Sequence, residues 1–370
     1  MSQAVAEVAA NLGTRLPDLI ELAREPSSEK RRALLRELTE HFFGSPDRTA
    51  AEAELYGQVL SQLASEMETA VRAELARRFA DALEAPPYLI RTLSRDDAAV
   101  AQSVLSSSPV LTDADLIEVV SRRSQMHIRA VSQRAEVSEA VSDAIVAHGD
   151  DEALDVLLRN DGARLSRDAS EQAVGRALVN PALHEATVAR KALPADLLNE
   201  MYFVVEQRLR LQILEQNARL DPALLESALA AGRTRMATED GVLPADYSEC
   251  ADYVEELRAA GQLTPQILAR FLRSGSRTAF YIALAQLADI DFHTARQIVE
   301  RRELDALAVV CKAADLDRSL FLTYAVALLN SEGDAMAKAH VYARMYAELQ
   351  REAALRTLRF WRMRREAQVA

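Results

Sequence analysis

Residues that end helices and shape turns are scarce in this sequence. Glycine and proline number 11 each among 370 residues, and aromatic residues make up only 5%. Apolar residues still account for 49% of the chain, mostly as Ala, Leu and Val, and Glu and Arg are frequent. Because few turn formers and many strong helix formers occur together, the composition predicts an all-α protein.

Long apolar runs and paired cysteines are also missing. No run approaches the roughly 20 apolar residues of a membrane-spanning helix, and no charged-then-apolar signal stands at the N-terminus. Cys250 and Cys311 are too isolated for a disulfide framework or a zinc site, so we expect two small buried hydrophobic residues. These absences predict a cytoplasmic protein without a transmembrane segment.

The motifs of catalysis and cofactor binding are absent as well. None of the six histidines stands three or four residues from another. The stretch HEATV begins at His184 like a zinc-protease helix, but Val188 stands where the second histidine should be. No glycine-rich phosphate loop or nucleophile elbow occurs, and the carboxylates are scattered. We therefore expect no enzyme, and we assign no catalytic, cofactor-binding or metal-ligating residue.

The net charge of −12 is unevenly distributed. From Lys338 onward, eight basic residues stand against three acidic ones, so the remainder of the chain is even more acidic than the whole. An acidic body repels phosphate backbones, which argues against nucleic-acid binding.

One helix start recurs along most of the chain. An apolar residue precedes each start at intervals of 26 to 28 residues, at Leu111, Val137, Leu165, Leu193 and Leu220, and again at Leu263, Ile290 and Leu316. A strong N-cap follows in seven of these eight units, at Thr112, Ser138, Ser166, Asp221, Thr264, Asp291 and Asp317. Pro194 takes the eighth position. We predict a helix to begin within two residues of each cap.

Each unit of about 27 residues carries two apolar-periodic segments. The first contains an apolar pair two turns into the helix, and the predicted core residues are Leu111, Val119, Val120, Ile145, Val146, Phe271, Leu272, Ile298 and Val299. One helix pair cannot bury its own apolar face, whereas stacked pairs can. The pattern therefore predicts an α-solenoid.

The chain divides into four predicted segments. Residues 1–84 form an N-terminal helical cap with a potential self-association face, including a long helix from Ser45 to about Leu83. The repeat array covers residues 85–240 and, after an inserted loop, residues 241–334. Residues 335–370 form a basic amphipathic helix.

Four motifs carry a resemblance to a known family. They are SSEKRRALLRELTEHFF, APPYLIRTLSRDDAAVAQSVLSSSPVLTDADLIEVV, VSEAVSDAIVAHGD and LLRNDGARLS. Residues 27 to 240 resemble an uncharacterised, mainly alphaproteobacterial family of helical-repeat proteins, the domain-of-unknown-function family number twenty-three thirty-six. One departure is Asp161, where proline is expected. The resemblance implies a HEAT-like repeat fold in a bacterial cytoplasm, and it assigns no functional residue.

Two basic features are candidate interaction surfaces. The first is an arginine stripe, Arg122, Arg123, Arg129, Arg134, Arg159 and Arg164, whose planar forks suit carboxylates or phosphates. The alternative is ordinary pairing with Glu118, Glu136 and Asp155. The second is the C-terminal helix, where Trp361 and Arg362 stand on or beside a broad apolar side. The apolar residues of this side are Val341, Met345, Leu349, Leu355, Leu358 and Trp361. This helix can bind a partner groove or an anionic membrane, or it can pack on its own repeats or on a second copy, and we expect Trp361 to be partly buried.

These features leave several functions open. The leading hypothesis is a non-enzymatic module that binds another protein as an adaptor, scaffold or regulator, with a homodimer as an alternative arrangement. The second is a sensor of a small molecule, anion or second messenger that uses the arginine stripe. A HEAT-like nucleic-acid-binding protein or DNA glycosylase is disfavoured, because the array is acidic and the sole tryptophan lies outside it.

Overall fold

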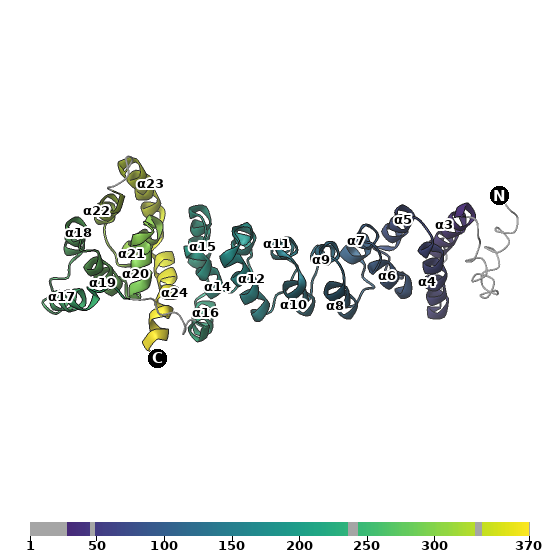
Figure 1. Ribbon diagram of the computed structural model, residues 1–370, viewed down its shortest axis with the longest axis horizontal. Helices are drawn as coiled ribbons and strands as arrows, with labels where there is room; N and C mark the ends of the chain where they lie inside the picture. The colour runs from purple at the N-terminus through teal and green to yellow at the C-terminus, as the bar shows by residue number, and fades with distance from the viewer. Residues whose placement is uncertain (1–27, 45–48, 236–242, 330–334, 370) are drawn as a thin grey trace. The chain divides into compact units, whose positions relative to one another are not determined.

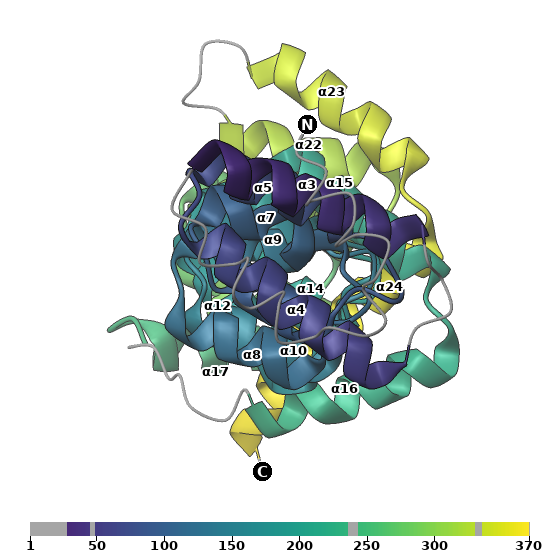
Figure 2. The ribbon, with the colours of Figure 1, turned by 90° about the vertical axis from the view of Figure 1, so that its right-hand side faces the viewer.

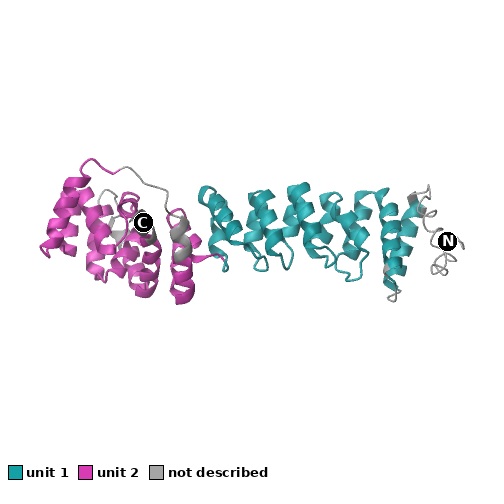
Figure 3. Ribbon diagram, turned by 90° about the horizontal axis from the view of Figure 1, so that it is seen from below, with its two compact units in different colours: residues 1–192 teal, residues 193–370 magenta. Residues whose placement is uncertain are grey.

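The computed structural model describes residues 28–44, 49–235, 243–329 and 335–369 (Figure 1). Every extended regular element in these ranges is a helix, and the one β-bridge is an isolated pairing of Val137 with Ala163. The prediction of an all-α protein is confirmed. The chain divides into two compact units, residues 1–192 and residues 193–370 (Figure 3).

Unit 1 packs its helices in two layers. The helices are α3 (Ser28–Gly44), α4 (Ala50–Ser65), α5 (Thr69–Phe79), α6 (Pro87–Ser94), α7 (Ala98–Ser107), α8 (Asp113–Arg122), α9 (Gln125–Ser132), α10 (Glu139–His148), α11 (Asp151–Arg159), α12 (Arg167–Val179), the 3-10 helix η1 (Pro181–Leu183) and α13 (His184–Ala189). In one layer α5, α7, α9, α11 and α13 pack side by side, and in the other α8, α10 and α12 do so. Figure 2 looks along these layers, with α5, α7 and α9 in one and α8 and α10 in the other. Each helix therefore contacts mainly its neighbours in the sequence.

The last helix of unit 2 packs against helices from the start and the end of the unit. Its helices are α14 (Ala195–Glu200), the 3-10 helix η2 (Met201–Phe203), α15 (Gln207–Arg219), α16 (Pro222–Arg235), α17 (Tyr247–Ala259), α18 (Pro265–Ser274), α19 (Arg277–Ala288), α20 (Phe292–Glu300), α21 (Leu304–Ala313), α22 (Arg318–Leu329), α23 (Ala335–Glu348) and α24 (Arg351–Val369). Helix α24 packs on α15 and α16 near the start of the unit and on α21 near its end. The first and last helices of unit 2 thus share one core.

All seven predicted helix starts are confirmed, because each helix begins one residue after its cap. The side chains of Thr112, Ser138, Ser166 and Asp291 each accept a hydrogen bond from the N–H three residues further on. Thr264 makes no such bond, and proline occupies the first position of that helix. These caps satisfy N–H groups that lack partners in the first turn.

The predicted core is confirmed at eight of its nine positions, and Leu272 is the exception. Leu272 is only partly buried, although it stands one turn after the buried Leu268 on α18. The expectation for the two cysteines is confirmed for Cys311, which is fully buried. It is wrong for Cys250, which is partly exposed beside Asp246.

The long helix predicted to reach Leu83 is wrong. The structure has two helices, α4 and α5, separated at Glu66–Glu68, where Glu68 adopts an extended conformation. An apolar row spaced by four residues drifts around one helix, and the break lets each half keep its own buried face. Leu83 lies beyond α5 and is 82% exposed. The predicted start at Ser45 and the segment ends at residues 240 and 334 lie outside the described residues.

Candidate protein-binding groove

The six arginines of the predicted stripe have different surroundings. Three of them pair with acidic side chains: Arg122 with Glu118 (3.5 Å), Arg129 with Asp150 (2.8 Å) and Glu152 (2.6 Å), and Arg159 with Asp155 (2.9 Å) and Glu185 (3.8 Å). Arg123 and Arg164 are exposed, whereas Arg134 is half-buried against main-chain carbonyls. A ligand for this stripe, and with it a sensor function, stays a prediction.

Arg134 belongs to a set of arginines, each of which caps the C-terminus of an earlier helix in its own layer. Its two terminal nitrogens donate to the carbonyl oxygens of Leu105 and Ser108, each at 2.8 Å, where α7 ends. Arg176 caps α10 in the same way, and Arg190 caps α11. The last carbonyls of a helix lack intrahelical partners and carry the negative end of its dipole, so a guanidinium satisfies both needs. The sequence signal is an arginine roughly one repeat after a helix end, and the prediction of Arg134 as part of a surface stripe missed it.

The predicted C-terminal helix is divided in two. Helix α23 ends at Glu348 and α24 begins at Arg351. The break separates two apolar faces with different neighbours, since α23 packs on α22 and α21 whereas α24 packs on α15, α16 and α21.

Trp361 is 4% exposed, which confirms that it is at least partly buried. Its ring lies 5.1 Å from that of Tyr202 and 5.2 Å from that of Phe203, between centroids. Arg362 follows and donates to the carbonyl oxygen of Ala288 at 3.0 Å, at the end of α19. The two predicted residues of this segment therefore hold α24 within unit 2.

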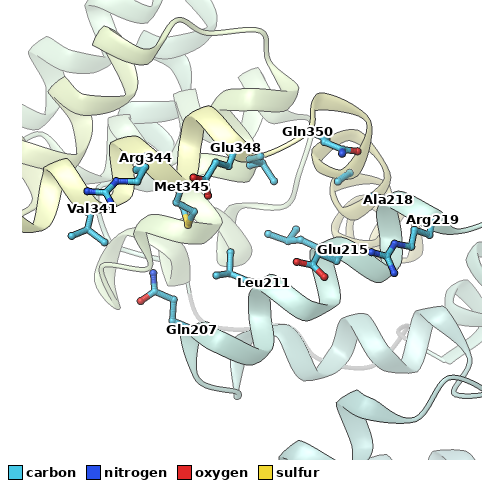
Figure 4. A pocket seen from close by; sticks show the side chains of 13 residues that line it. Gln207, Leu211, Glu215, Ala218, Arg219, Val341, Arg344, Met345, Glu348 and Gln350 are labelled. Atoms are coloured by element: carbon cyan, nitrogen blue, oxygen red, sulfur yellow. The ribbon is translucent and has the colours of Figure 1, made fainter.

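A groove of about 600 Å³ lies between α15 and α23 (Figure 4). The residues that line it are Gln207, Leu211, Leu214, Glu215, Ala218 and Arg219 of α15, Val341, Arg344, Met345 and Glu348 of α23, Leu349 and Gln350 between α23 and α24, and Ala353 of α24. On both walls the lining positions recur every three or four residues, so each helix turns one face to the groove. Val341 is 58% exposed and Leu211 is 37% exposed, although both are large and apolar.

Arg210 fixes the N-terminal half of the α15 wall. Its guanidinium donates to both oxygens of Asp305, at 3.0 and 3.1 Å, and lies 3.5 Å from Glu303. Its Nε also donates to the carbonyl oxygen of Val205 at 3.0 Å, just before α15 begins. Burial is the main cause that raises the pKa of Glu303 to about 7, while Arg210 opposes this shift. An ion pair with the buried Asp305 fixes the direction of α15.

Helix α24 fixes the other end of the same wall. Arg356 donates to the carbonyl oxygens of Asn217, Ala218 and Leu220 at 3.2, 3.0 and 2.5 Å, which caps the C-terminus of α15. The Asn217 amide also donates to Thr357 Oγ1 at 2.7 Å. The α15 wall is thus held at both ends before any ligand binds.

Tyr346 anchors the α23 wall. Its ring stacks on Phe321 with centroids 4.6 Å apart, and its hydroxyl donates to the carbonyl oxygen of Leu316 at 2.5 Å. Lys312 donates to the Tyr346 carbonyl oxygen at 3.1 Å, and its ammonium lies 4.8 Å from the ring centroid. These contacts attach α23 to α21 and α22 on the side away from the exposed Val341.

The groove combines an apolar lining with charged residues on both walls. Glu215 and Arg219 stand one turn apart on α15, and Arg344 and Glu348 stand one turn apart on α23. Among the described residues, no group of His, Cys, Asp or Glu side chains is arranged to hold a metal ion. The arrangement can bury apolar side chains and pair with charged ones. Sequence reasoning identified Val341, Met345 and Leu349 but missed the α15 wall, whose signal is the apolar spacing of Leu211, Leu214 and Ala218.

The fold and groove define an all-α protein of sequentially packed helices. The family model described as "Uncharacterised protein conserved in bacteria (DUF2336)" matches residues 100–359, so the chain belongs to this family. The resemblance seen in the sequence is confirmed, although the match begins within α7 and ends within α24. No curated protein and no solved structure matches the chain. None of the helices in the described ranges has the length and hydrophobicity that crossing a bilayer requires.

Proposed function

We propose that the chain is a non-enzymatic protein-binding module of the bacterial cytoplasm, an adaptor, scaffold or regulator, that holds a helix of another protein between α15 and α23. The observation that carries the proposal is the groove, in which the exposed Val341 and Leu211 lie on opposite, separately anchored walls. Because the anchors lie within unit 2 itself, the walls are in place before a partner arrives, and preorganised walls lower the entropic cost of binding.

The scaffold that we propose is an α-solenoid of HEAT-like helix pairs. Three observations support it: helix starts recur at 26 to 28 residues, capped side chains mark these starts, and the helices of unit 1 pack mainly on their sequence neighbours. Proteins of this architecture use extended surfaces to bind other proteins.

A helix suits this groove better than a small molecule. The groove runs along α15 from Gln207 to Arg219, which is about 18 Å at 1.5 Å per residue. It is also open enough to leave Val341 more than half exposed, whereas small-molecule sites bury most of the ligand's surface. Two helices that each present a face with three- and four-residue spacing offer the ridges into which a third helix packs.

Substitutions in the groove test this function. Leu211→Asp and Val341→Asp place a charge on each wall, and both positions are exposed enough that the melting temperature should not change. We expect partners crosslinked to the wild-type chain in its native cells to be lost, and a purified partner to bind at least about tenfold more weakly, because the charge must be desolvated on docking.

The matched controls are Leu224→Asp on α16 and Val179→Asp on α12, which change exposed apolar residues outside the groove. Unchanged binding by these controls supports the proposal. If the groove variants and the controls bind the purified partner equally well, the groove is not the binding site.

A further inference from the structure

Four charged side chains line the groove without an ion-pair partner among the described residues. Within the described part of the chain, Glu215, Arg219, Arg344 and Glu348 have no ion-pair partner, although Glu215 and Arg219 are spaced to pair along α15. Other charged side chains of the same unit are paired, as Arg359 is with Glu226 at 2.6 Å. The charges at the groove are therefore available to a ligand.

The order of these charges along the groove is specific. Figure 4 shows Arg344 toward the end marked by Gln207 and Val341, and Arg219 toward the opposite end. Glu215 and Glu348 lie between the two arginines, one on each wall. The middle of the groove thus presents two carboxylates of opposite walls, and the positive charges stand outside them.

We propose that the helix held in the groove is a basic amphipathic helix of another protein. Its apolar stripe covers Leu211, Val341 and Met345, and a lysine or arginine near its centre binds Glu215 and Glu348. This inference rests on the proposed function and adds the chemistry of the partner.

Charge complementarity carries this choice. An acidic side chain at the centre of the bound helix would face two carboxylates, whereas a basic one pairs with them and replaces their lost hydration. The net charge of −12 acts in the same direction, since it attracts cationic partners and repels anionic ones at long range.

Synthetic helices of one design provide the probe. Each peptide is about as long as α15, is stapled on its outer face, and carries leucines every three or four residues, with lysine, glutamine or glutamate at the centre. Binding to the full-length protein is followed by fluorescence anisotropy at physiological salt. We expect the lysine peptide to bind about fivefold to tenfold more tightly than the glutamine peptide, and the glutamate peptide to bind most weakly.

The double variant Glu215→Gln with Glu348→Gln should remove this preference and keep the affinity for the glutamine peptide. The control double variant Glu136→Gln with Glu139→Gln removes two exposed acids of unit 1 and should keep the preference. This control separates a local effect from the long-range effect of net charge.

Each other outcome overturns the inference in a recognisable way. Equal binding of the three peptides, with loss of all three in Leu211→Asp, would leave the groove as a helix site and reject the basic centre. A lysine preference that persists in the groove double variant would show that the net charge of the protein, and not Glu215 and Glu348, causes the preference. Absence of binding by every peptide would reject the helix-binding groove itself. A dimer of the free protein that Leu211→Asp dissociates would show that a second copy occupies the groove.

Discussion

Units 1 and 2 use the same local chemistry to start helices but connect them over very different distances along the chain. In unit 1 Arg134 binds the carbonyl oxygen of Leu105, 29 positions earlier. In unit 2 Arg356 binds that of Asn217, 139 positions earlier. Both arginines cap the end of a helix. The difference is that unit 1 caps a near neighbour, whereas unit 2 brings its last helix back to one of its first.

This difference bears on how the two units unfold. A stack in which helices contact only their neighbours can open from an end, one layer at a time. A core that contains α15, α16, α21 and α24 loses all of these contacts together, so unit 2 should behave as one cooperative unit. The same long-range contacts hold the two walls of the groove in position.

The largest effect should follow from removing α24 by ending the chain after Gln350. Unit 2 then loses the partner of α15, α16 and α21 and exposes their apolar faces. We expect its cooperative unfolding transition to disappear and hydrogen-exchange protection to be lost in residues 207–229 and 304–313. Protection in residues 98–159 of unit 1 serves as the internal control and should remain. Retained protection in α15 and α21 would show that α24 is not part of their core.

Charged substitutions in the two cores should cost about 3–5 kcal/mol of unfolding free energy each. Val120→Asp affects unit 1 and Ile298→Asp affects unit 2, and both wild-type side chains are buried. Hydrogen exchange should show loosening limited to α8 and its neighbours in the first variant, and spread through unit 2 in the second. Glu118→Asp on the polar side of α8 should be nearly silent. If both core substitutions reduce hydrogen-exchange protection over equally large regions, the two units do not differ in cooperativity.

Removing a capping arginine should cost less, about 1–3 kcal/mol, because carbonyl groups lose charge-assisted hydrogen bonds. Arg134→Ala should destabilise unit 1 around α7 and α9, and Arg356→Ala should destabilise unit 2 as a whole. Arg122→Ala removes a guanidinium with only one long ion pair, at 3.5 Å, and should change stability by less than about 0.5 kcal/mol. Urea unfolding measures all three. A loss at Arg122 equal to that at Arg134 would refute the capping role.

The smallest effect should be the pH dependence that Glu303 gives to unit 2 alone. Its pKa rises from 4.5 to about 7 on folding, so the native state binds this proton more tightly than the unfolded chain does. The stabilisation is complete below pH 4.5 and is lost as the pH rises through 7. Glu303→Gln should match the wild type near pH 4.5 and exceed it by about 1–2 kcal/mol at pH 8. Glu300→Gln, which changes an exposed residue, should show no such divergence in thermal unfolding.

The features that the sequence revealed were local ones. A residue such as Thr112 or Asp291 caps a helix through atoms three residues away, so the pattern of caps predicted where helices begin. The core positions followed from the same periodicity. The break between α4 and α5 was missed because a row spaced by four residues looks continuous in the sequence, although it drifts around a real helix.

The candidate groove could be predicted only in part, since its walls come from segments far apart in the chain. Val341 and Met345 stood out as one apolar side of the C-terminal segment, but nothing local relates them to Leu211, 130 positions earlier. The partners of the arginines were hidden for the same reason. A guanidinium that caps the carbonyls of an earlier helix has the same sequence signature as one that faces solvent.

Fluorescence of Trp361 tests most directly whether α24 closes its own unit, because this residue is the only tryptophan in the chain. The account predicts a blue-shifted emission that a soluble quencher barely reduces and that stays unchanged on serial dilution, since the ring packs on Tyr202 and Phe203 of the same unit. A red-shifted, fully quenched emission would contradict it. A blue shift that disappears on dilution would contradict it too, because a second copy would then supply the contact.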